Sequence, residues 1–579
     1  MFKLLFKYTK DGWKSAMLGP ILVILEVIFD LGIPYAMALI IDEGINNRGG
    51  DINYIVKLGL IMVGLAIVAG IFGALSGISV SVASCRFTRN IRSAMLEKIQ
   101  EYDFKNIEKF PVSSVVVRMT SDMRMLRMAY TSIIRTMIRA IVMLILTAIM
   151  IFRLNSALAN VFAVAIPILG AGLIIIMMKA RPRFRILMSK FDAMNAGLKE
   201  NIEGIRVVKN FVRAEYEEDK FEKVSKDVLK SQRYAENVII LNQPLFELVM
   251  YACMIAVAWY GGNFIIAGSL TTGQFMSYLS YLRQILFSLL GISISLTQIV
   301  NARASVDRAN ELLDEKPSID DSLADKNLLV KDGSIEFNDV SFKYFDEAKK
   351  DTLTNINLKI QSGETIGILG PTGAGKSTLV QLIPRLYDIK QGQIKVGGRD
   401  IKDYSLYNLR EGVSMVLQKN LLFSGTIKEN LLWGNPYAND EEIIEACKKA
   451  QAHDFIMSFP DGYNTVLDQG GNNVSGGQKQ RLCIARALLK KPKILILDDS
   501  TSACDTNTDK KIQEALKNKL DSMTSIIIAQ RVSSVKDCDH IIIMNDGRID
   551  DIGTHDELLN RNEVYKDLYE TQLQGVQNG

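Results

Sequence analysis

Hydrophobic residues are distributed very unevenly along this chain. The N-terminal half contains six long apolar runs, at residues 16–41, 58–85, 134–152, 154–178, 238–266 and 273–300. A helix needs about 20 apolar residues to cross the hydrocarbon layer of a membrane. The runs have that length, and Leu58–Cys85 contains no charged residue. The pattern predicts six membrane-spanning helices, since so many runs in one half are not typical of a large soluble core.

The second half has a different rhythm. After Arg308 the long apolar runs stop, and from Ser334 onward short strand-like runs alternate with helical patterns, as in α/β domains. The polar stretch between the two parts reads as a linker. We therefore expect an all-α transmembrane domain over 1–308, a linker over 309–333 and an α/β domain over 334–579.

Loop charges predict the orientation of the spans, because Lys and Arg collect on the cytoplasmic side. The N-terminal tail, the segment after the second run and the end of the fourth run are rich in Lys and Arg. The loops "DEGINNRGGD" and "AGSLTTG" are not. Both termini are therefore expected in the cytoplasm, in a multi-pass protein of the cytoplasmic membrane. Two long polar segments, 86–131 and 179–237, are expected to form helical arms that reach a cytoplasmic partner.

A few charged residues interrupt the apolar runs: Glu26, Asp30, Arg135, Arg139, Glu247 and Arg283. Charge inside a membrane is costly and usually faces a cavity or a partner. Glu26 and Asp30 are four residues apart and share a helix face. One interpretation is an acidic path that favours cationic apolar substrates. The other, which we place slightly ahead, is a structural pairing, for instance with Arg283, or a position near a water-filled vestibule.

The overall composition excludes several classes of function. The formal net charge of the 579 residues is +4, which is too small for a nucleic-acid-binding protein. The six cysteines are scattered without a CxxC pair, so neither a zinc site nor a disulfide framework is predicted. The basic N-terminus lacks the short apolar core and cleavage site of a signal peptide.

A phosphate-binding loop stands out in the second half. "GETIGILGPTGAGKSTLV" places a buried strand, Glu364–Leu369, before a match to G-x-x-x-x-G-K-[ST] and a helix. Glycines let backbone N–H groups surround phosphate oxygens, and the helix N-terminus adds its positive dipole end. Lys376 is expected to neutralise the β- and γ-phosphates of ATP, and Ser377 to ligate Mg²⁺. The second domain is thus predicted to be an α/β P-loop NTPase.

Two further motifs fit the same chemistry. The apolar strand "KILILD" ends at Asp498, a carboxylate suited to orienting Mg²⁺ or its water. Upstream, "NNVSGGQKQRLCIARALL" places Ser475 at a helix start, where it suits an N-cap and an anion site. Its position between a phosphate loop and a strand that ends in Asp498–Asp499 makes this motif specific.

Together these residues resemble the ATP-binding-cassette family, and six spans followed by one cassette is the layout of its exporter half-transporters. The resemblance implies ATP-binding roles for Tyr344 (adenine stacking), Gly370, Pro371, Thr372, Gly373, Ala374, Gly375, Lys376, Ser377 and Thr378 (phosphate loop) and Gln418, and Mg²⁺ contacts for Ser377, Gln418 and Asp498. Ser475 and Gly477 match the signature that acts on the ATP of a partner chain, and Ser502–Asp505 matches the loop that crosses the dimer. "FPVSSVVVRMTSD" and "IRVVKNFVRAEYEEDKF" resemble inner loops that dock on cassettes.

The chain departs from the family pattern at three places. Asp499 stands where hydrolytic members have Glu, and Gln530 where they have a histidine that contacts the γ-phosphate. Asp is shorter by one C–C bond, about 1.5 Å, and an amide cannot carry the charge of an imidazolium. None of His453, His540 and His555 fits that strand end. Finally, Asp468–Gly471 replaces the common GERG, which weakens an expected acidic contact with the partner's inner loops.

These departures predict a degenerate site that binds ATP and hydrolyses it slowly or not at all. Because the signature is nearly intact, a heterodimer is expected, in which it completes a competent site on a second half-transporter with Glu and His. We therefore predict an ATPase-coupled exporter of amphipathic or hydrophobic compounds, with membrane lipids as neighbours and no nucleic-acid partner. The alternatives are a lipid or peptide exporter, and a non-pumping ATP-gated channel or regulatory subunit.

Overall fold

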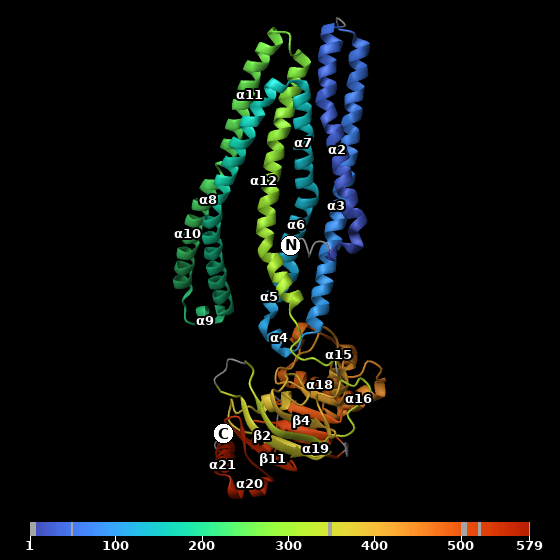
Figure 1. The fold of residues 1–579 in the computed structure, drawn as a ribbon. Helices are drawn as coiled ribbons and strands as arrows, with labels where there is room; N and C mark the ends of the chain where they lie inside the picture. The colour runs from blue at the N-terminus through green and yellow to red at the C-terminus, as the bar shows by residue number, and fades with distance from the viewer. Residues whose placement is uncertain are drawn as a thin grey trace. The chain divides into compact units, whose positions relative to one another are not determined.

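The computed structural model describes residues 7–47, 50–322, 324–345, 350–499, 506–518 and 523–577 (Figure 1). The chain divides into two compact units, which are described separately below. The helical unit comprises Met1–Gln100 and Val112–Glu315, and the α/β unit comprises Glu101–Pro111 and Lys316–Gly579. The short segment Glu101–Pro111 thus belongs to the α/β unit, although it lies within the N-terminal half of the sequence.

The helical unit is built of long helices, several of which run side by side (Figure 1). Its elements are η1 (Lys10–Gly12), α2 (Trp13–Leu39), η2 (Ile40–Asn47), α3 (Ile52–Gln100), α5 (Val112–Val117), η3 (Arg118–Asp122), α6 (Met123–Thr131), η4 (Ser132–Met137), α7 (Ile138–Leu154), α8 (Ser156–Glu203), α9 (Ile205–Asn210), α10 (Ala214–Ile239), α11 (Asn242–Ile266) and α12 (Thr272–Asp314). Pro20 and Pro34 lie inside α2, and Pro167 and Pro182 inside α8.

Six helical segments of the described residues are long and apolar enough to cross a membrane, as the apolar runs predicted. Their most apolar windows bury only 17% to 28% of their residues within the unit. Most of this apolar surface therefore needs a non-aqueous surrounding. The buried minority forms a core between α2, α7, α8, α11 and α12, with Tyr278, Tyr281 and Phe162 among its largest side chains. Several helices continue well beyond their apolar runs, and α3 alone has 49 residues.

The described residues of the α/β unit form three sheets. Its strands are β1 (Ile335–Phe342), β2 (Leu353–Ile360), β3 (Thr365–Leu369), β4 (Gln391–Val396), β5 (Arg399–Asp400), β6 (Val413–Val416), β7 (Gly425–Thr426), β8 (Val466–Leu467), β9 (Ile494–Asp498), β10 (Thr524–Ile528), β11 (His540–Asn545) and β12 (Arg548–Gly553). Its helices are α4 (Phe104–Lys109), α13 (Lys376–Gln381), α14 (Leu406–Gly412), α15 (Ile427–Leu432), α16 (Asp440–Lys449), α17 (His453–Met457), η5 (Gly462–Asn464), η6 (Gln469–Gly471), α18 (Gly476–Leu489), α19 (Thr506–Asn518), η7 (Val532–Ser534), α20 (His555–Arg561) and α21 (Glu563–Gln577).

The central sheet has the order β12-β11-β3-β10-β9-β6 and is parallel except at β12. Its strands are continuous apolar runs such as "ILILD", because both faces of a parallel sheet are covered. A separate antiparallel sheet has the order β2-β1-β4-β5. The neighbours β3, β10 and β9 end at the same edge of the central sheet, where ligands of open α/β sheets bind. The predicted fold class, six apolar helices followed by an α/β P-loop domain, is confirmed.

Candidate functional site

The phosphate loop follows the carboxyl end of β3. Three of its glycines, Gly370, Gly373 and Gly375, have positive φ angles of 150°, 85° and 92°. A Cβ atom on Gly370 would lie 2.1 Å from the carbonyl oxygen of Met544, so only glycine fits there. The loop leads directly into α13, whose N-cap is Gly375. The strand, loop and helix predicted from the sequence are therefore present in that order.

Lys376 bends back over this loop. Its Nζ donates to the carbonyl oxygens of Gly370, at 2.8 Å, and Pro371, at 2.9 Å. Burial lowers the pKa of Lys376, while Asp499 and Asp498 act in the opposite direction. The ammonium of Lys376 can therefore exchange its two carbonyl partners for phosphate oxygens when a nucleotide binds.

Ser377 and Asp498 come together although they are far apart in the sequence. The Ser377 hydroxyl donates to Oδ1 of Asp498 at 2.9 Å. Asp498 is buried, and that burial raises its pKa, an effect that Asp499 reinforces and Ser377 opposes. A hydroxyl and a carboxylate oxygen at this spacing fit Mg²⁺, which prefers hard oxygen ligands and is usually shared with substrate phosphates. The side chains present thus fit the predicted metal.

Asp499 lies at the centre of a second cluster. Its Oδ2 accepts a hydrogen bond from Nε2 of Gln530 at 2.6 Å and a longer one from Nε2 of Gln418 at 3.5 Å. Asp499 is buried, and its backbone is left-handed, with φ at 49°. Its N–H bonds the carbonyl of Ile528, because β9 and β10 pair in register at Asp498 and Ile528. Asp499, Gln530 and Gln418, all predicted from the sequence, therefore meet. The amide N–H of Gln530 donates to one of the two carboxylate oxygens of Asp499.

Tyr344 lies against a cavity of about 460 Å³, whose lining includes Phe342, Tyr387 and Lys105. Its ring meets those of Phe342 and Tyr387 edge-on, with centroids 5.0 Å away in each case. Its hydroxyl lies 2.9 Å from Oγ1 of Thr378, at the start of α13. The predicted base-stacking residue is therefore connected to the phosphate loop.

Helix α4 is a part of this region that the sequence motifs do not predict. Asp103 caps α4 and also accepts hydrogen bonds from the backbone N–H groups of Ser318 and Ile319. The hydroxyl of Tyr387 donates to Oε1 of Glu108 at 2.6 Å. The stretch "FPVSSVVVRMTSD" resembles the first docking loop, but only its beginning lies in the α/β unit, together with the residues that precede it from Glu101. The capping box formed by Asp103 and Asn106 was a readable sign of this helix.

The signature residues lie at the start of α18. Ser475 is its N-cap: Oγ accepts from the N–H of Gln478, whose side chain accepts in turn from the N–H of Ser475. The carbonyl of Gly477 accepts from Arg481. Among the described residues, no hydrogen bond joins Ser475 or Gly477 to the phosphate loop. The crossing loop Ser502–Asp505 lies outside the described residues.

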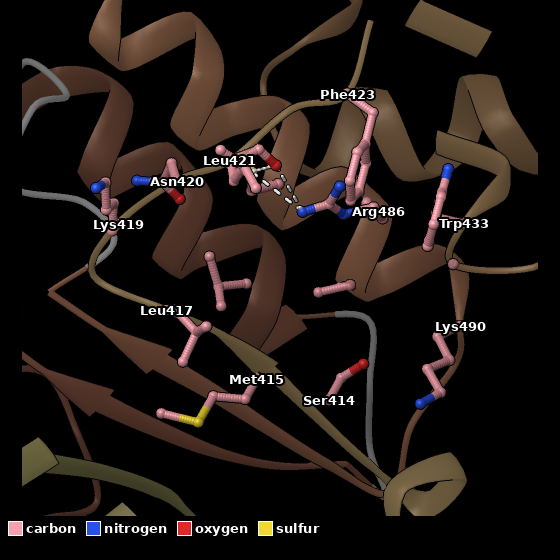
Figure 2. Close-up of a pocket in the computed structure, with 14 residues that line it drawn as sticks. Ser414, Met415, Leu417, Lys419, Asn420, Leu421, Phe423, Trp433, Arg486 and Lys490 are labelled. Atoms are coloured by element: carbon pink, nitrogen blue, oxygen red, sulfur yellow. Dashed lines mark hydrogen bonds between the residues drawn. The ribbon is translucent and has the colours of Figure 1, made fainter. Parts of the chain in front are cut away.

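An open groove lies beside α18 and β6 (Figure 2). It has a volume of about 330 Å³, and its walls include the apolar side chains of Met415, Leu417 and Leu421. Phe423 and Trp433 stack at its rim with ring centroids 4.5 Å apart. Both rings are exposed. Its lining includes residues on both sides of Gln418 in the sequence, such as Leu417 and Lys419.

Two of the acidic residues that interrupt the apolar runs pair with one arginine. Nε of Arg139 lies 3.0 Å from Glu26, and its Nη2 lies 3.3 Å from Asp30. The structural pairing weighed from the sequence is therefore present, but its partner is Arg139 rather than Arg283. Glu247 accepts a hydrogen bond from Gln243 on its own helix. The acidic path that was the other interpretation of Glu26 and Asp30 stays a prediction.

Known families and proteins match nearly the whole chain. Residues 16–289 match the family model "ABC transporter transmembrane region", and residues 353–502 match the model "ABC transporter". The computed fold is similar to a solved structure described as a bacterial Atm1-family ABC exporter with ATP bound. The TM-score is 0.85, the identity is 24%, and the match covers 96% of this chain and 99% of that one.

Curated relatives cover similar lengths. The uncharacterised ABC transporter ATP-binding protein YfiB of Bacillus subtilis is 35% identical over 96% of this chain and 95% of its own. An ATP-dependent lipid A-core flippase of Desulfotalea psychrophila is 33% identical, over 90% and 91%. The putative multidrug export protein YgaD of Bacillus subtilis is 34% identical, over 83% of each chain. With its apolar helices and its ATP-binding cassette, this multi-pass membrane protein belongs to the ABC transporter family and has the fold of an ABC exporter.

Proposed function

We propose that this chain is one subunit of a heterodimeric exporter that moves amphipathic or hydrophobic compounds across the cytoplasmic membrane. Its own phosphate-loop site binds ATP and Mg²⁺ but hydrolyses slowly, and most turnover occurs at the site that its signature completes on a partner chain. The observation that carries this proposal is the 2.6 Å hydrogen bond between Gln530 and Asp499.

That contact bears on hydrolysis in two ways. A group that positions or deprotonates the attacking water must lie within hydrogen-bond reach of it. Asp499 has less reach than Glu, and one of its oxygens is already taken by Gln530. The amide N–H of Gln530 donates to the Asp499 carboxylate, and its neutral side chain adds no positive charge near a phosphoryl group. A displacement of about 1 Å at such a site can cost about 100-fold in rate.

The signature supports the second half of the proposal. In its capping role the Oγ of Ser475 is a hydrogen-bond acceptor, so its own proton remains available for donation. The start of α18 also offers the N-terminal end of a 14-residue helix, which favours an anion. Such a surface suits the terminal phosphate of an ATP molecule held by a second chain with Glu and His at the matching positions.

Coupling to transport is proposed to run through the inner loops. Beyond α9, and outside the six apolar runs, Phe211 and Val212 are 69% and 86% exposed. The groove beside Gln418 offers apolar side chains such as Leu417 and Leu421 together with polar ones such as Lys419 (Figure 2). We assign the groove to the second inner loop of the partner chain. We also propose that both termini and the cassette lie in the cytoplasm, with domain boundaries at residues 308 and 333.

The nature of the cargo has alternatives. The relatives include a protein named as a lipid flippase and one named as a multidrug exporter, so lipids and foreign amphiphiles are both candidates. Peptide export and a non-pumping regulatory role remain less supported, since neither has a specific observation in its favour. Bound Mg²⁺ would neutralise phosphate charge between Ser377 and Asp498.

The test compares two substitutions in the complex of this chain with the neighbouring cassette protein. Ser475→Ala removes the proposed donor to the partner's ATP, so we expect a loss of most ATPase activity and of dye export into inverted vesicles. Asp499→Asn should change either activity less than twofold, because that site contributes little. The reverse ranking, or full activity of this chain alone, would contradict the asymmetric heterodimer.

A further inference from the structure

A polar cavity lies within the helical unit, between α2, α7 and α12. Its volume is about 490 Å³, within the range of about 300–1,000 Å³ that is usual for small-molecule sites. Three charged side chains line it: Asp30, Arg139 and Arg283. The rest of the wall is mixed, with apolar groups such as Phe287 and the amide of Gln284.

The two guanidinium groups of this cavity differ in their partners. Asp30 is engaged by Arg139, which also pairs with Glu26. Arg283 has no carboxylate within ion-pair distance among the described residues, and its guanidinium lies 5.7 Å from the ring centroid of Phe287. Among the described residues, Arg139 is therefore held by two carboxylates, whereas Arg283 is a charged residue of the lining that takes part in no ion pair.

The depth of Arg283 makes its lack of an ion-pair partner significant. Arg283 is the twelfth residue of α12, which starts at Thr272. At 1.5 Å per residue it lies about 16 Å along the helix, roughly half of a hydrocarbon layer of about 30 Å. A charge at that depth is costly unless it faces water, a partner or a ligand. The neighbouring Gln284 also has a buried Oε1 with no hydrogen-bond partner among the described residues. An exposed guanidinium with no ion-pair partner and a buried amide oxygen with no hydrogen-bond partner, among the described residues, thus line one cavity.

We propose that this cavity binds the anionic headgroup of an amphiphile, with Arg283 as the main contact. The guanidinium offers a planar pair of donors to a phosphate, sulfate or carboxylate, and Gln284 can accept from a hydroxyl of the same molecule. The apolar tail would follow the apolar wall. This inference rests on the proposed export function and names the class of its cargo. It is opposite in sign to the cationic substrates that Glu26 and Asp30 first indicated.

Binding without ATP tests this inference separately from export. The purified full-length complex in detergent is titrated with fluorescent single-chain probes: a lysophosphatidylglycerol, a monoacylglycerol and an alkyl-trimethylammonium of equal chain length. We expect the anionic probe to bind most tightly. Arg283→Gln should weaken it by about 10- to 100-fold, as for a lost charge-assisted hydrogen bond, and leave the monoacylglycerol within twofold. Arg283→Lys should retain part of the affinity.

The matched control is Arg153→Gln, at the exposed end of α7 and outside the cavity lining. A lipophilic oxonol anion distinguishes the sources: binding comparable to the lipid probe indicates a general anion site, and much weaker binding indicates a lipid headgroup site. Equal losses for anionic and neutral probes in Arg283→Gln, or tightest binding of the ammonium probe, would overturn the proposal. Export can fail while this binding persists, so the two proposals fail separately.

Discussion

The two sides of the nucleotide site differ in how far they follow the family pattern. We call the phosphate-holding side Gly370–Ser377 with Asp498, and the cleavage side Asp499 with Gln530. On the phosphate-holding side every side chain is of the expected type, and Ser377 meets Asp498 at 2.9 Å. On the cleavage side both side chains are substituted and bond each other at 2.6 Å.

Holding a nucleotide and cleaving it therefore depend on separate groups. Holding needs backbone geometry, one ammonium and oxygen ligands, and tolerates small displacements. Cleavage needs a water in one position and charge where it develops in the transition state. A subunit can thus lose the second ability while keeping the first, provided that its bound ATP still stabilises the closed state and shifts the population toward it.

The largest effect is expected on the phosphate-holding side. Lys376→Ala removes the only side-chain ammonium of the phosphate loop, so ATP affinity at this site should fall by about 10- to 100-fold, the value of a charge-assisted hydrogen bond. Photolabelling with an azido-ATP, followed by separation of the two chains, measures the sites individually. Lys511→Ala, exposed on α19, is the control. Unchanged labelling of this chain would mean that its loop does not hold ATP.

An intermediate effect is expected from repair of the cleavage side. Asp499→Glu with Gln530→His should raise hydrolysis at this site, by up to about 100-fold if displacement is the main defect. The measurement uses a complex in which the partner's catalytic Glu is Gln, so that only this site turns over. Because the two residues are in direct contact, each single change should give less than half of the combined gain in activation free energy. No gain would place the defect elsewhere.

The parts of the fold that sequence predicts are those with local signals. Spanning helices follow from long apolar runs, and the phosphate loop follows from glycines between a strand and a helix. Ser475 as an N-cap is also a local pattern, and its capping box is present. Even the meeting of Asp499 and Gln530 was within reach, because parallel pairing of β9 and β10 aligns Asp498 with Ile528 and so brings their following residues together.

The missed features all depend on packing between distant segments. Arg139 pairs with Glu26, from which it is separated by 113 positions in the sequence. The sequence around Glu26 does not indicate whether Arg139 or Arg283 is its partner. The docking of α4 joins Glu108 to Tyr387 across 279 positions. A six-residue helix has too few residues for a periodic signal, so its capping box was the only sequence sign of it. Two features could be recognised only from the fold: Arg283 of the cavity between α2, α7 and α12, which takes part in no ion pair among the described residues, and the contact between Glu108 of α4 and Tyr387.

The contact between Tyr387 and Glu108 of α4 gives the prediction with the smallest expected effect. Tyr387 bonds Glu108 of α4 and lies edge-on to Tyr344, the predicted base-stacking residue. It therefore connects the base end of the nucleotide site to a segment whose flanks, Gln100 and Val112, belong to the helical unit. Tyr387→Phe keeps the ring and removes one hydrogen bond to a carboxylate, worth about 1.5–3 kcal/mol. Transport per ATP hydrolysed should fall severalfold while ATP affinity stays unchanged.

A double-substitution cycle separates this role from a general loss of stability. Glu108→Gln should lower transport per ATP in the same direction, and the double variant should be no worse than the more affected single one, since both remove one contact. Tyr437→Phe is the control, because that side chain is 95% exposed. Additive losses, or a fall in ATP affinity equal to the fall in transport, would mean that the Tyr387–Glu108 bond only stabilises the fold. Cleavage and coupling would then both have to run through the Gln418 side of the site, where Nε2 lies 3.5 Å from Asp499.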